Sequence, residues 1–261
     1  MKGPLAARVA TAAVLLAGLL AALFLLPRLA LAALLAMLVL LAAHEWARLC
    51  RLGTGAAWLY AAATSVVFVA AGMLGLERAL FGAAALFWLA VAPVWMWRGV
   101  RAEFTTALGA AGVAVLVPAG LAMLVLRPAE VLVVLALVWI ADTGAYFVGR
   151  AWGRRKLAPS ISPGKTWEGA IGGLLGAAAY AIICGILIQE LAWAPFLAIA
   201  VLLAMLSIAG DLFESAVKRQ AGVKDSGSLL PGHGGLLDRI DSATATLPVA
   251  ALLWPLVKAN S

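Results

Sequence analysis

The sequence predicts an all-α integral membrane protein with about nine transmembrane helices and a polar site at the cytoplasmic side of its C-terminal half. Apolar residues make up 65% of the 261 residues, against about 45–50% in soluble domains. Charged residues fall to 12%, and the mean hydropathy is +1.06. Long runs rich in Ala and Leu favour helices over barrel strands, which would show short segments of alternating polarity.

Nine stretches approach the length of about 20 mostly apolar residues that a membrane-spanning helix needs. Three cores are short (the second, eighth and ninth), so we expect their helices to extend into flanking polar residues. The first follows Lys2 and Arg8, as a signal peptide would, but its run exceeds the usual 7–15 or so apolar residues, and we interpret it as a retained helix. The cores lie at residues 9–26, 29–43, 56–76, 79–97, 107–126, 129–148, 169–189, 193–209 and 242–257.

Basic residues separate these cores and predict their orientation. Lys2 and Arg8 precede the first core, and Lys258 follows the last. Counted along the chain, 15 of the 19 Lys and Arg residues fall in the N-terminal segment and every second connection, and 4 fall in the remaining segments. By the positive-inside rule, the N-terminus is cytoplasmic and the C-terminus lies outside. The net charge of +7 is thereby explained without nucleic acid as a partner.

We treat residues 1–261 as a single membrane domain with an uneven distribution of polar chemistry. Residues 1–141 contain no aspartate, whereas all five aspartates lie between 142 and 241. Two long connections, 149–168 and 210–241, are expected to be cytoplasmic loops that carry the site. The aspartates are Asp142, Asp211, Asp225, Asp238 and Asp241.

Several of these acids are candidate metal ligands. Asp238 and Asp241 are three residues apart and would share one face of a helix, and two close carboxylates repel unless a cation or proton lies between them. With Asp211 they offer the oxygen ligands that Mg²⁺ prefers. Asp142 lies within an apolar stretch, where an aspartate costs about 2.5–3.5 kcal/mol on insertion scales and is a functional candidate by default.

Cations, hydroxyls and glycines accompany the acids. If residues 211–219 are helical, Asp211, Ser215 and Lys218 lie on one face. Gly234 and Gly235 would allow backbone N–H groups to approach a ligand closely. Such a mixture suits phosphoryl or nucleotidyl transfer, which needs charge neutralisation of a polyphosphate. The other candidates in the two loops are Ser162, Lys165, Thr166, Arg219, Lys224, Asp225, His233 and Arg239.

Simpler roles are open for individual residues. The cations fit a positive-inside surface, and Glu214 with Lys218, or Asp238 with Arg239, would form local salt bridges. His44 and Glu45 are interpreted as interfacial caps of the second helix. Gly169, Gly172, Gly173 and Gly176 have the spacing of helix-packing glycines. Gly164-Lys165-Thr166 is not a P-loop, because Pro159 occupies the position of the first glycine and no strand precedes it.

Residues 215–241 resemble the phosphatidate cytidylyltransferases, also called CDP-diacylglycerol synthases. The matching pattern is Ser-x-Val-Lys-Arg-x4-Lys-Asp-x-Gly-x2-Leu-Pro-x-His-Gly-Gly-Leu-x-Asp-Arg-Ile-Asp. The blocks 142–146, 162–169 and 210–215 look like other polar segments of this family. The resemblance is close over about residues 139–245, within the half of the chain (139–261) that we expect to be catalytic. The helices of residues 1–138 vary in the family and match only in hydropathy.

The resemblance implies transfer of CMP from CTP to phosphatidate, giving CDP-diacylglycerol and pyrophosphate in phospholipid biosynthesis. It implies Mg²⁺ as cofactor, allows a second cation and a homodimer, and places the enzyme among the lipids of a bacterial-type cytoplasmic membrane. Asp211, Asp238 and Asp241, with Asp142 the weaker candidate, are assigned to metal. Lys165, Lys218, Arg219 and Lys224 are assigned to phosphates, and His233 with its glycines shapes the site.

Two other functions are compatible with parts of the sequence. A CTP-dependent lipid-alcohol kinase would use similar site chemistry with a hydroxyl acceptor, but the full 27-residue match argues against it. An ion-coupled transporter would scatter acids across several helices near mid-membrane. Here most of the acids lie at the edges of two loops, which favours transfer chemistry.

Overall fold

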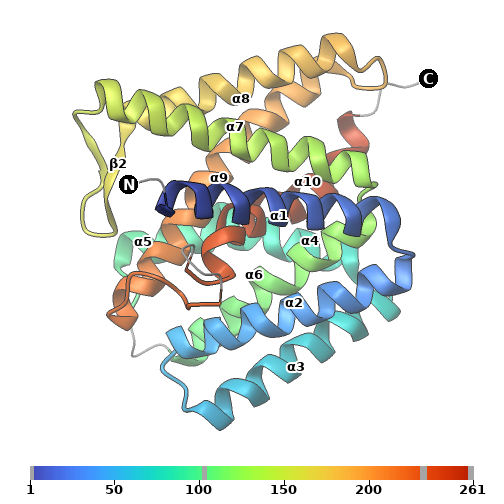
Figure 1. Cartoon of the computed structure of the whole chain (residues 1–261), viewed down its shortest axis with the longest axis vertical. Helices are drawn as coiled ribbons and strands as arrows, with labels where there is room; N and C mark the ends of the chain where they lie inside the picture. Colours follow the sequence, from blue (N-terminus) through green and yellow to red (C-terminus); the bar gives the residue numbers. More distant parts are fainter. Residues whose placement is uncertain (1–2, 102–104, 230–233, 258–261) are drawn as a thin grey trace.

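The computed structural model describes residues 3–101, 105–229 and 234–257, with side chains from residue 11 onward. Nine apolar helical segments follow one another in this part of the chain (Figure 1), which confirms the predicted number of segments. They are α1 (Gly3–Leu25), α2 (Arg28–Leu49), α3 (Thr54–Met73), a composite segment of α4 (Glu77–Leu86), η1 (Phe87–Val91) and α5 (Ala92–Arg98), α6 (Thr105–Val125), α7 (Pro128–Trp152), α8 (Trp167–Leu187), α9 (Trp193–Ala221) and α10 (Leu237–Val257).

Eight of these segments are long and apolar enough to cross a membrane, and α1 adds a shorter apolar stretch at Thr11–Leu25 within the described side chains. The short cores extend into polar sequence as expected. In particular, α9 runs for 29 residues, which corresponds to about 44 Å at 1.5 Å per residue. Because a hydrocarbon core is about 30 Å thick, the polar end of α9 projects beyond it.

The centre of the bundle is formed by α6, α9 and α10, which have the highest buried fractions among the candidate spans. The pair α7 and α8 packs closely on one side of this centre (Figure 1). A Cβ atom on Gly173 would lie 2.8 Å from the carbonyl oxygen of Ala141, and one on Gly172 would overlap Val148. The predicted packing role of these glycines is confirmed, because only glycine lets the two backbones approach so closely.

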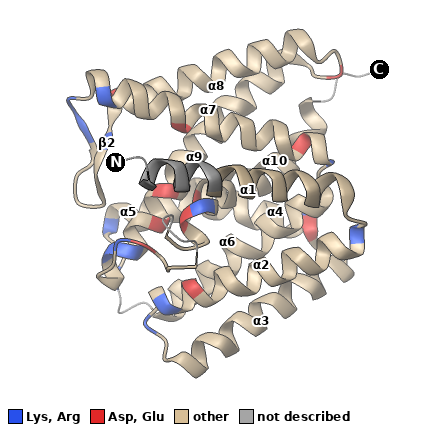
Figure 2. Cartoon of the chain, in the orientation of Figure 1, with Lys and Arg blue, Asp and Glu red and all other residues tan. Residues whose placement is uncertain are grey.

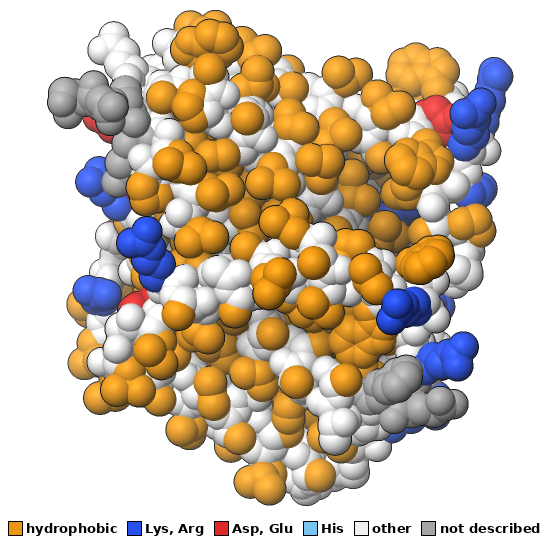
Figure 3. Space-filling view, turned by 180° about the vertical axis from the view of Figure 1, so that it is seen from behind, with side chains coloured by type: hydrophobic (Ala, Val, Ile, Leu, Met, Phe, Trp, Pro, Cys, Tyr) orange, Lys and Arg blue, Asp and Glu red, His pale blue; other side chains and the backbone are white. Residues whose placement is uncertain are grey.

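The helices end in two layers of unlike chemistry. The helix α1 begins and α9 ends at the end of the bundle where the strand β2 lies, whereas α10 ends on the opposite side (Figure 1). Most of the Lys and Arg residues drawn in Figure 2 lie at the end with β2, and the face between the two ends is covered by apolar side chains (Figure 3). We call the end that holds β2 and the C-terminus of α9 the polar end.

Both connections that we expected to be loops are partly regular. Residues 149–168 contain the last turn of α7 and an antiparallel hairpin of β1 (Lys156–Ala158) and β2 (Ser162–Thr166). Residues 210–241 contain the end of α9 and the beginning of α10, so that only 222–236 connect them. The apolar pattern missed these elements because it follows burial in lipid, whereas the hairpin and the helix ends lie outside the apolar cores.

Candidate active site

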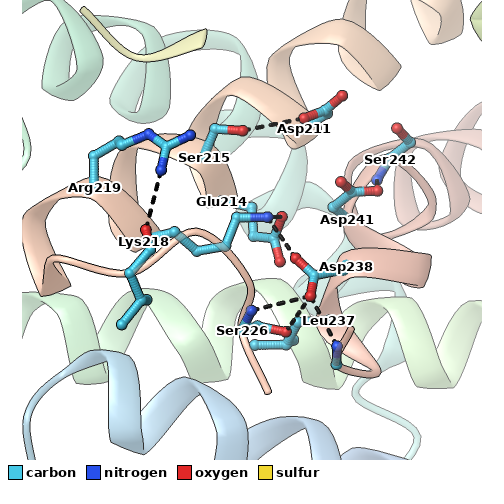
Figure 4. A network of polar contacts seen from close by, with 12 residues as sticks. Asp211, Glu214, Ser215, Lys218, Arg219, Ser226, Leu237, Asp238, Asp241 and Ser242 are labelled. Carbon is cyan, nitrogen blue, oxygen red and sulfur yellow. Dashed lines mark hydrogen bonds and ion pairs between the residues drawn. The ribbon is translucent and has the colours of Figure 1, made fainter. Parts of the chain in front are cut away.

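The predicted site residues converge from four elements. The last three turns of α9 carry Asp211 to Arg219, the first two turns of α10 carry Asp238 and Asp241, the hairpin carries Lys165, and α7 carries Asp142. Residues 211–219 are helical, as the sequence argument required. Their side chains nevertheless divide into two groups with different surroundings (Figure 4).

The first group is a buried ion cluster around Lys218. Its Nζ atom lies 2.7 Å from Oε2 of Glu214 and 2.5 Å from Oδ1 of Asp238. The side chains are 10%, 4% and 7% exposed, so the ammonium group is largely shielded from solvent. The local Glu214–Lys218 salt bridge, one of the simpler roles left open by the sequence, is present, whereas Asp238 pairs with Lys218 and not with Arg239, whose side chain is exposed.

Asp238 has its acceptor positions filled by the protein. In addition to Lys218, it accepts hydrogen bonds at Oδ2 from the backbone N–H of Ser226 (3.0 Å), the Ser226 hydroxyl (3.0 Å) and the backbone N–H of Gly235 (2.9 Å). A carboxylate offers about four lone-pair positions. We therefore do not retain Asp238 as a metal ligand or Lys218 as a phosphate ligand: both hold the 222–236 connection against α9.

Glu45 of α2 completes this arrangement from the N-terminal half. Its carboxylate, 7% exposed, accepts hydrogen bonds from the Ser226 hydroxyl (3.1 Å) and from the backbone N–H groups of Leu236 (3.0 Å) and Leu237 (2.9 Å). Leu237 is the first residue of α10, so Glu45 satisfies N–H groups that a helix start leaves without partners and places a negative charge at the positive end of the helix dipole.

The interpretation of Glu45 as an interfacial cap of α2 was therefore wrong: it caps α10. The close fit also explains two glycines. A Cβ atom on Gly227 would lie 2.5 Å from Oε1 of Glu45, and one on Gly235 would lie 2.6 Å from its Oε2. No local pattern could reveal this role, because the partners lie about 180 to 190 positions away in the chain.

We expect Glu45→Gln to lower both stability and turnover. The amide keeps one acceptor oxygen but turns an NH₂ group toward backbone donors, and each buried unpaired group costs about 1–3 kcal/mol. Thermal unfolding in detergent and the rate of nucleotidyl transfer are the measurements. Glu190→Gln is the matched control, because Glu190 is exposed; a Glu45→Gln protein as stable and active as that control would contradict the capping role.

The second group consists of carboxylates that face Lys165. The Lys165 ammonium lies 2.6 Å from Oδ2 of Asp211, with side chains 25% and 37% exposed. Asp211 also accepts a hydrogen bond from the Ser215 hydroxyl (3.3 Å). Asp211 lies close enough to Asp142 and to Asp241 for their charges to interact, and Lys165 interacts with both. The three carboxylates thus interact with Lys165, and Asp241 also interacts with Lys218 of the first group.

Polar contacts orient this second group. The Ser207 hydroxyl donates to Oδ1 of Asp142 (3.2 Å), and the backbone N–H of Ser242 donates to Oδ1 of Asp241 (2.7 Å). The backbone N–H groups of Arg154 and Arg155 donate to the Glu168 carboxylate (3.0–3.3 Å), which fixes the base of the hairpin that carries Lys165. These acids retain free acceptor positions, unlike Asp238.

The second group fits a magnesium ion better than the predicted set does. Among the described residues, no three His, Cys, Asp or Glu side chains form a closed metal cage. Mg²⁺ does not require one, because it typically binds one or two carboxylates and completes its coordination with water and substrate phosphate. Asp211 and Asp241 satisfy that requirement, with Asp142 near them.

The remaining candidates have individual surroundings. The Thr166 hydroxyl accepts a hydrogen bond from the N–H of Gly169 (3.1 Å) and caps α8, so it is a structural residue. Arg219 donates to the carbonyl oxygens of Ile161 (3.4 Å) and Val223 (3.2 Å) and ties the hairpin tip to α9. Ser162 pairs with Ala158 in the hairpin, and Gly234 adopts a positive φ of 81° beside Asp238. Lys224 and Asp225 are exposed. His233 lies outside the described residues.

Comparison with known proteins covers nearly the whole chain. A family model described as the cytidylyltransferase family matches residues 6–257. The phosphatidate cytidylyltransferase of Pseudomonas aeruginosa is 43% identical over 268 aligned positions, covering 95% of this chain and 96% of the relative. The enzymes of that name from Haemophilus influenzae (53% identical over 122 positions, 45% of this chain and 42% of the relative) and Thermotoga maritima (41% over 136 positions, 50% of each) match about half of it.

Proposed function

Because the chain belongs to the cytidylyltransferase family, we propose that it is a phosphatidate cytidylyltransferase, which transfers CMP from CTP to phosphatidate and releases pyrophosphate. Family membership makes the protein a nucleotidyltransferase, and its apolar helices make it an integral membrane protein. The observation that carries the proposal is the group of Asp142, Asp211, Asp241 and Lys165 at the polar end. This position allows a water-soluble triphosphate and a lipid phosphate to meet.

The reaction joins two anions, and the residues of the site follow from that requirement. The phosphate of phosphatidate is itself a nucleophile at neutral pH, so no strong general base is needed. One oxygen of the lipid phosphate attacks the α-phosphorus of CTP, the bond from this phosphorus to the bridging oxygen breaks, and pyrophosphate departs. Cations must screen the attack and the negative charge on the leaving group.

Asp211 and Asp241 would hold Mg²⁺, with Asp142 supporting them. When bound, the ion supplies charge neutralisation for the triphosphate. Lys165, which pairs with Asp211, is on a hairpin and would exchange this carboxylate for a phosphate oxygen. Ser215 would orient Asp211 through its hydrogen bond. Lys224 and Arg239, both exposed, stay candidates for contacts with the nucleotide, as does His233.

We place the polar end on the cytoplasmic side of the membrane. The described connections at this end include those that carry the larger share of basic residues, which supports this orientation. CTP is then available from the side where nucleotides are made. A homodimer and a second cation stay predictions.

Purified protein incubated with phosphatidate, Mg²⁺ and CTP labelled either at the α- or at the γ-phosphate tests the function. We expect label in the lipid from α-labelled CTP alone, and no lipid label when EDTA is added. Transfer of the γ-phosphate would instead indicate a lipid kinase, and no transfer of either label would remove the enzymatic proposal. Diacylglycerol in place of phosphatidate is the matched acceptor control, because it lacks the attacking phosphate.

A further inference from the structure

An open groove lies on the composite segment formed by α4, η1 and α5. It has a volume of about 650 Å³ and is lined by Val91, Val94, Trp95, Arg98 and Arg101, with Ala107 of α6. This volume falls in the range of about 300–1,000 Å³ that is typical of small-molecule sites. The groove lies apart from the carboxylates described above.

The groove lies on an irregular helix. Residues Phe87–Val91 form a π-helical turn, and Pro93 follows it at the start of α5. Wider turns of this kind are often found at functional sites, and proline removes a backbone donor. At the end of α5, Gly99 adopts a φ of 87°, which favours glycine, and the chain turns so that both Arg98 and Arg101 line the groove.

The lining of the groove is amphipathic in a definite order. Val91 and Val94 are 45% and 46% exposed and form an apolar wall within the spanning segment. Arg98 and Arg101 are exposed at its polar end, and among the described ion pairs neither guanidinium has a carboxylate partner. An apolar wall inside the membrane and two cations at its edge match one kind of molecule, a lipid with a strongly anionic headgroup.

The groove is also connected to the site helix. Trp95 packs against Phe213 of α9, with ring centroids 5.7 Å apart. Phe213 is fully buried and lies two residues after Asp211. Trp95 therefore connects the lining of the groove to the part of α9 that carries Asp211.

We propose that this groove is a docking site for phosphatidate, in which Arg98 and Arg101 bind the phosphomonoester and one acyl chain lies along Val91 and Val94. The proposal rests on the function proposed above and adds the place where the lipid substrate binds before transfer. A phosphomonoester carries a charge of about −1.5 to −2 at neutral pH, whereas a phosphodiester lipid carries a single negative charge. Two guanidinium groups therefore balance the charge of the phosphomonoester better. Arginine suits the task because its planar fork binds two phosphate oxygens at once.

Replacement of both arginines, Arg98→Gln with Arg101→Gln, tests the proposal in mixed micelles. We expect the KM for phosphatidate to rise about tenfold, as the loss of two charge-assisted contacts at an exposed site implies, whereas the KM for CTP and kcat stay unchanged. A second variant, Val94→Trp, should raise the same KM by filling the apolar wall. Arg78→Gln is the control, because Arg78 is an exposed residue near the opposite end of the same composite segment.

Direct binding separates this proposal from the proposed function. Native mass spectrometry of the protein with phosphatidate or with phosphatidylglycerol should show retention of phosphatidate by the wild type and its loss in the double arginine variant. Equal retention of the two lipids by the wild type, or an unchanged KM for phosphatidate in the variants, would overturn the docking site. A wild type that transfers no CMP but still retains phosphatidate through these arginines would contradict the proposed function alone.

Discussion

Asp241→Asn is expected to reduce CMP transfer by about 10²–10³-fold, the range found when one preorganised electrostatic group is removed from an active site, while the protein remains folded. The change removes a negative charge from the group that faces Lys165. It retains the Oδ1 atom that accepts the hydrogen bond from the backbone N–H of Ser242. Asparagine therefore preserves the local structure of α10 and removes only the charge that would hold a cation.

The measurement is the initial rate of label transfer from α-labelled CTP to phosphatidate, paired with thermal unfolding followed by tryptophan fluorescence. Asp211→Asn should behave in the same way, whereas Glu190→Gln, at an exposed position away from the site, should retain the wild-type rate. Near-normal turnover by both the Asp241 and the Asp211 variants would remove the second group of acids from the mechanism.

Asp238→Asn separates the two groups of acids. Its carboxylate accepts from Lys218, Ser226 and Gly235, so an amide NH₂ would face a donor whichever way it turned. We expect a clear loss of thermal stability together with any loss of activity, in contrast to Asp241→Asn. Two acids three residues apart on one helix would then differ in role.

Lys218→Met is expected to destabilise the protein by about 3–5 kcal/mol, the cost of breaking a buried ion pair on one side. The methionine side chain fills much of the same space, but Glu214 and Asp238 lose the cation that lies between them. The buried atom Oε1 of Glu214 already has no hydrogen-bond partner among the described atoms, so Glu214 has no second donor there that could replace Lys218.

Denaturant or thermal unfolding in detergent measures this loss, with Lys156→Met on the exposed strand β1 as the matched control. Addition of Glu214→Gln to Lys218→Met should recover part of the stability, since one uncompensated charge is removed. If Lys218→Met were as stable as the control and had only a raised KM for CTP, the structural role would be wrong and the phosphate-binding role assigned from sequence would be restored.

The spanning helices could be predicted from sequence because the information is local. A stretch of about 20 apolar residues has to be a helix in lipid, where each backbone group must find its partner within the segment. The same reasoning located the polar end of α9, and the spacing of Gly169, Gly172 and Gly173 indicated the close packing of α7 and α8. The β1–β2 hairpin lay beyond this reasoning, since it is short and outside the membrane-length pattern.

The site was predicted in composition but not in its division of roles. The restriction of aspartates to 142–241 and the mixture with lysine and glycine indicated where transfer chemistry lies. Sequence could not show that Asp238 is enclosed by donors while Asp211 and Asp241 keep free oxygens. Nor could it show that Glu45, from the half of the chain with no aspartate, caps α10.

By itself, then, the sequence determined the membrane class, the nine helical segments and the type of chemistry, because hydrophobic length, charge sign and residue type act along the chain within a few turns. Only the tertiary structure showed which carboxylates are enclosed by donors and which keep free acceptor positions. The reason is that the role of an acid depends on how many donors surround it, and for Asp238 and Glu45 those donors come from segments that meet only when α2, α9 and α10 pack together.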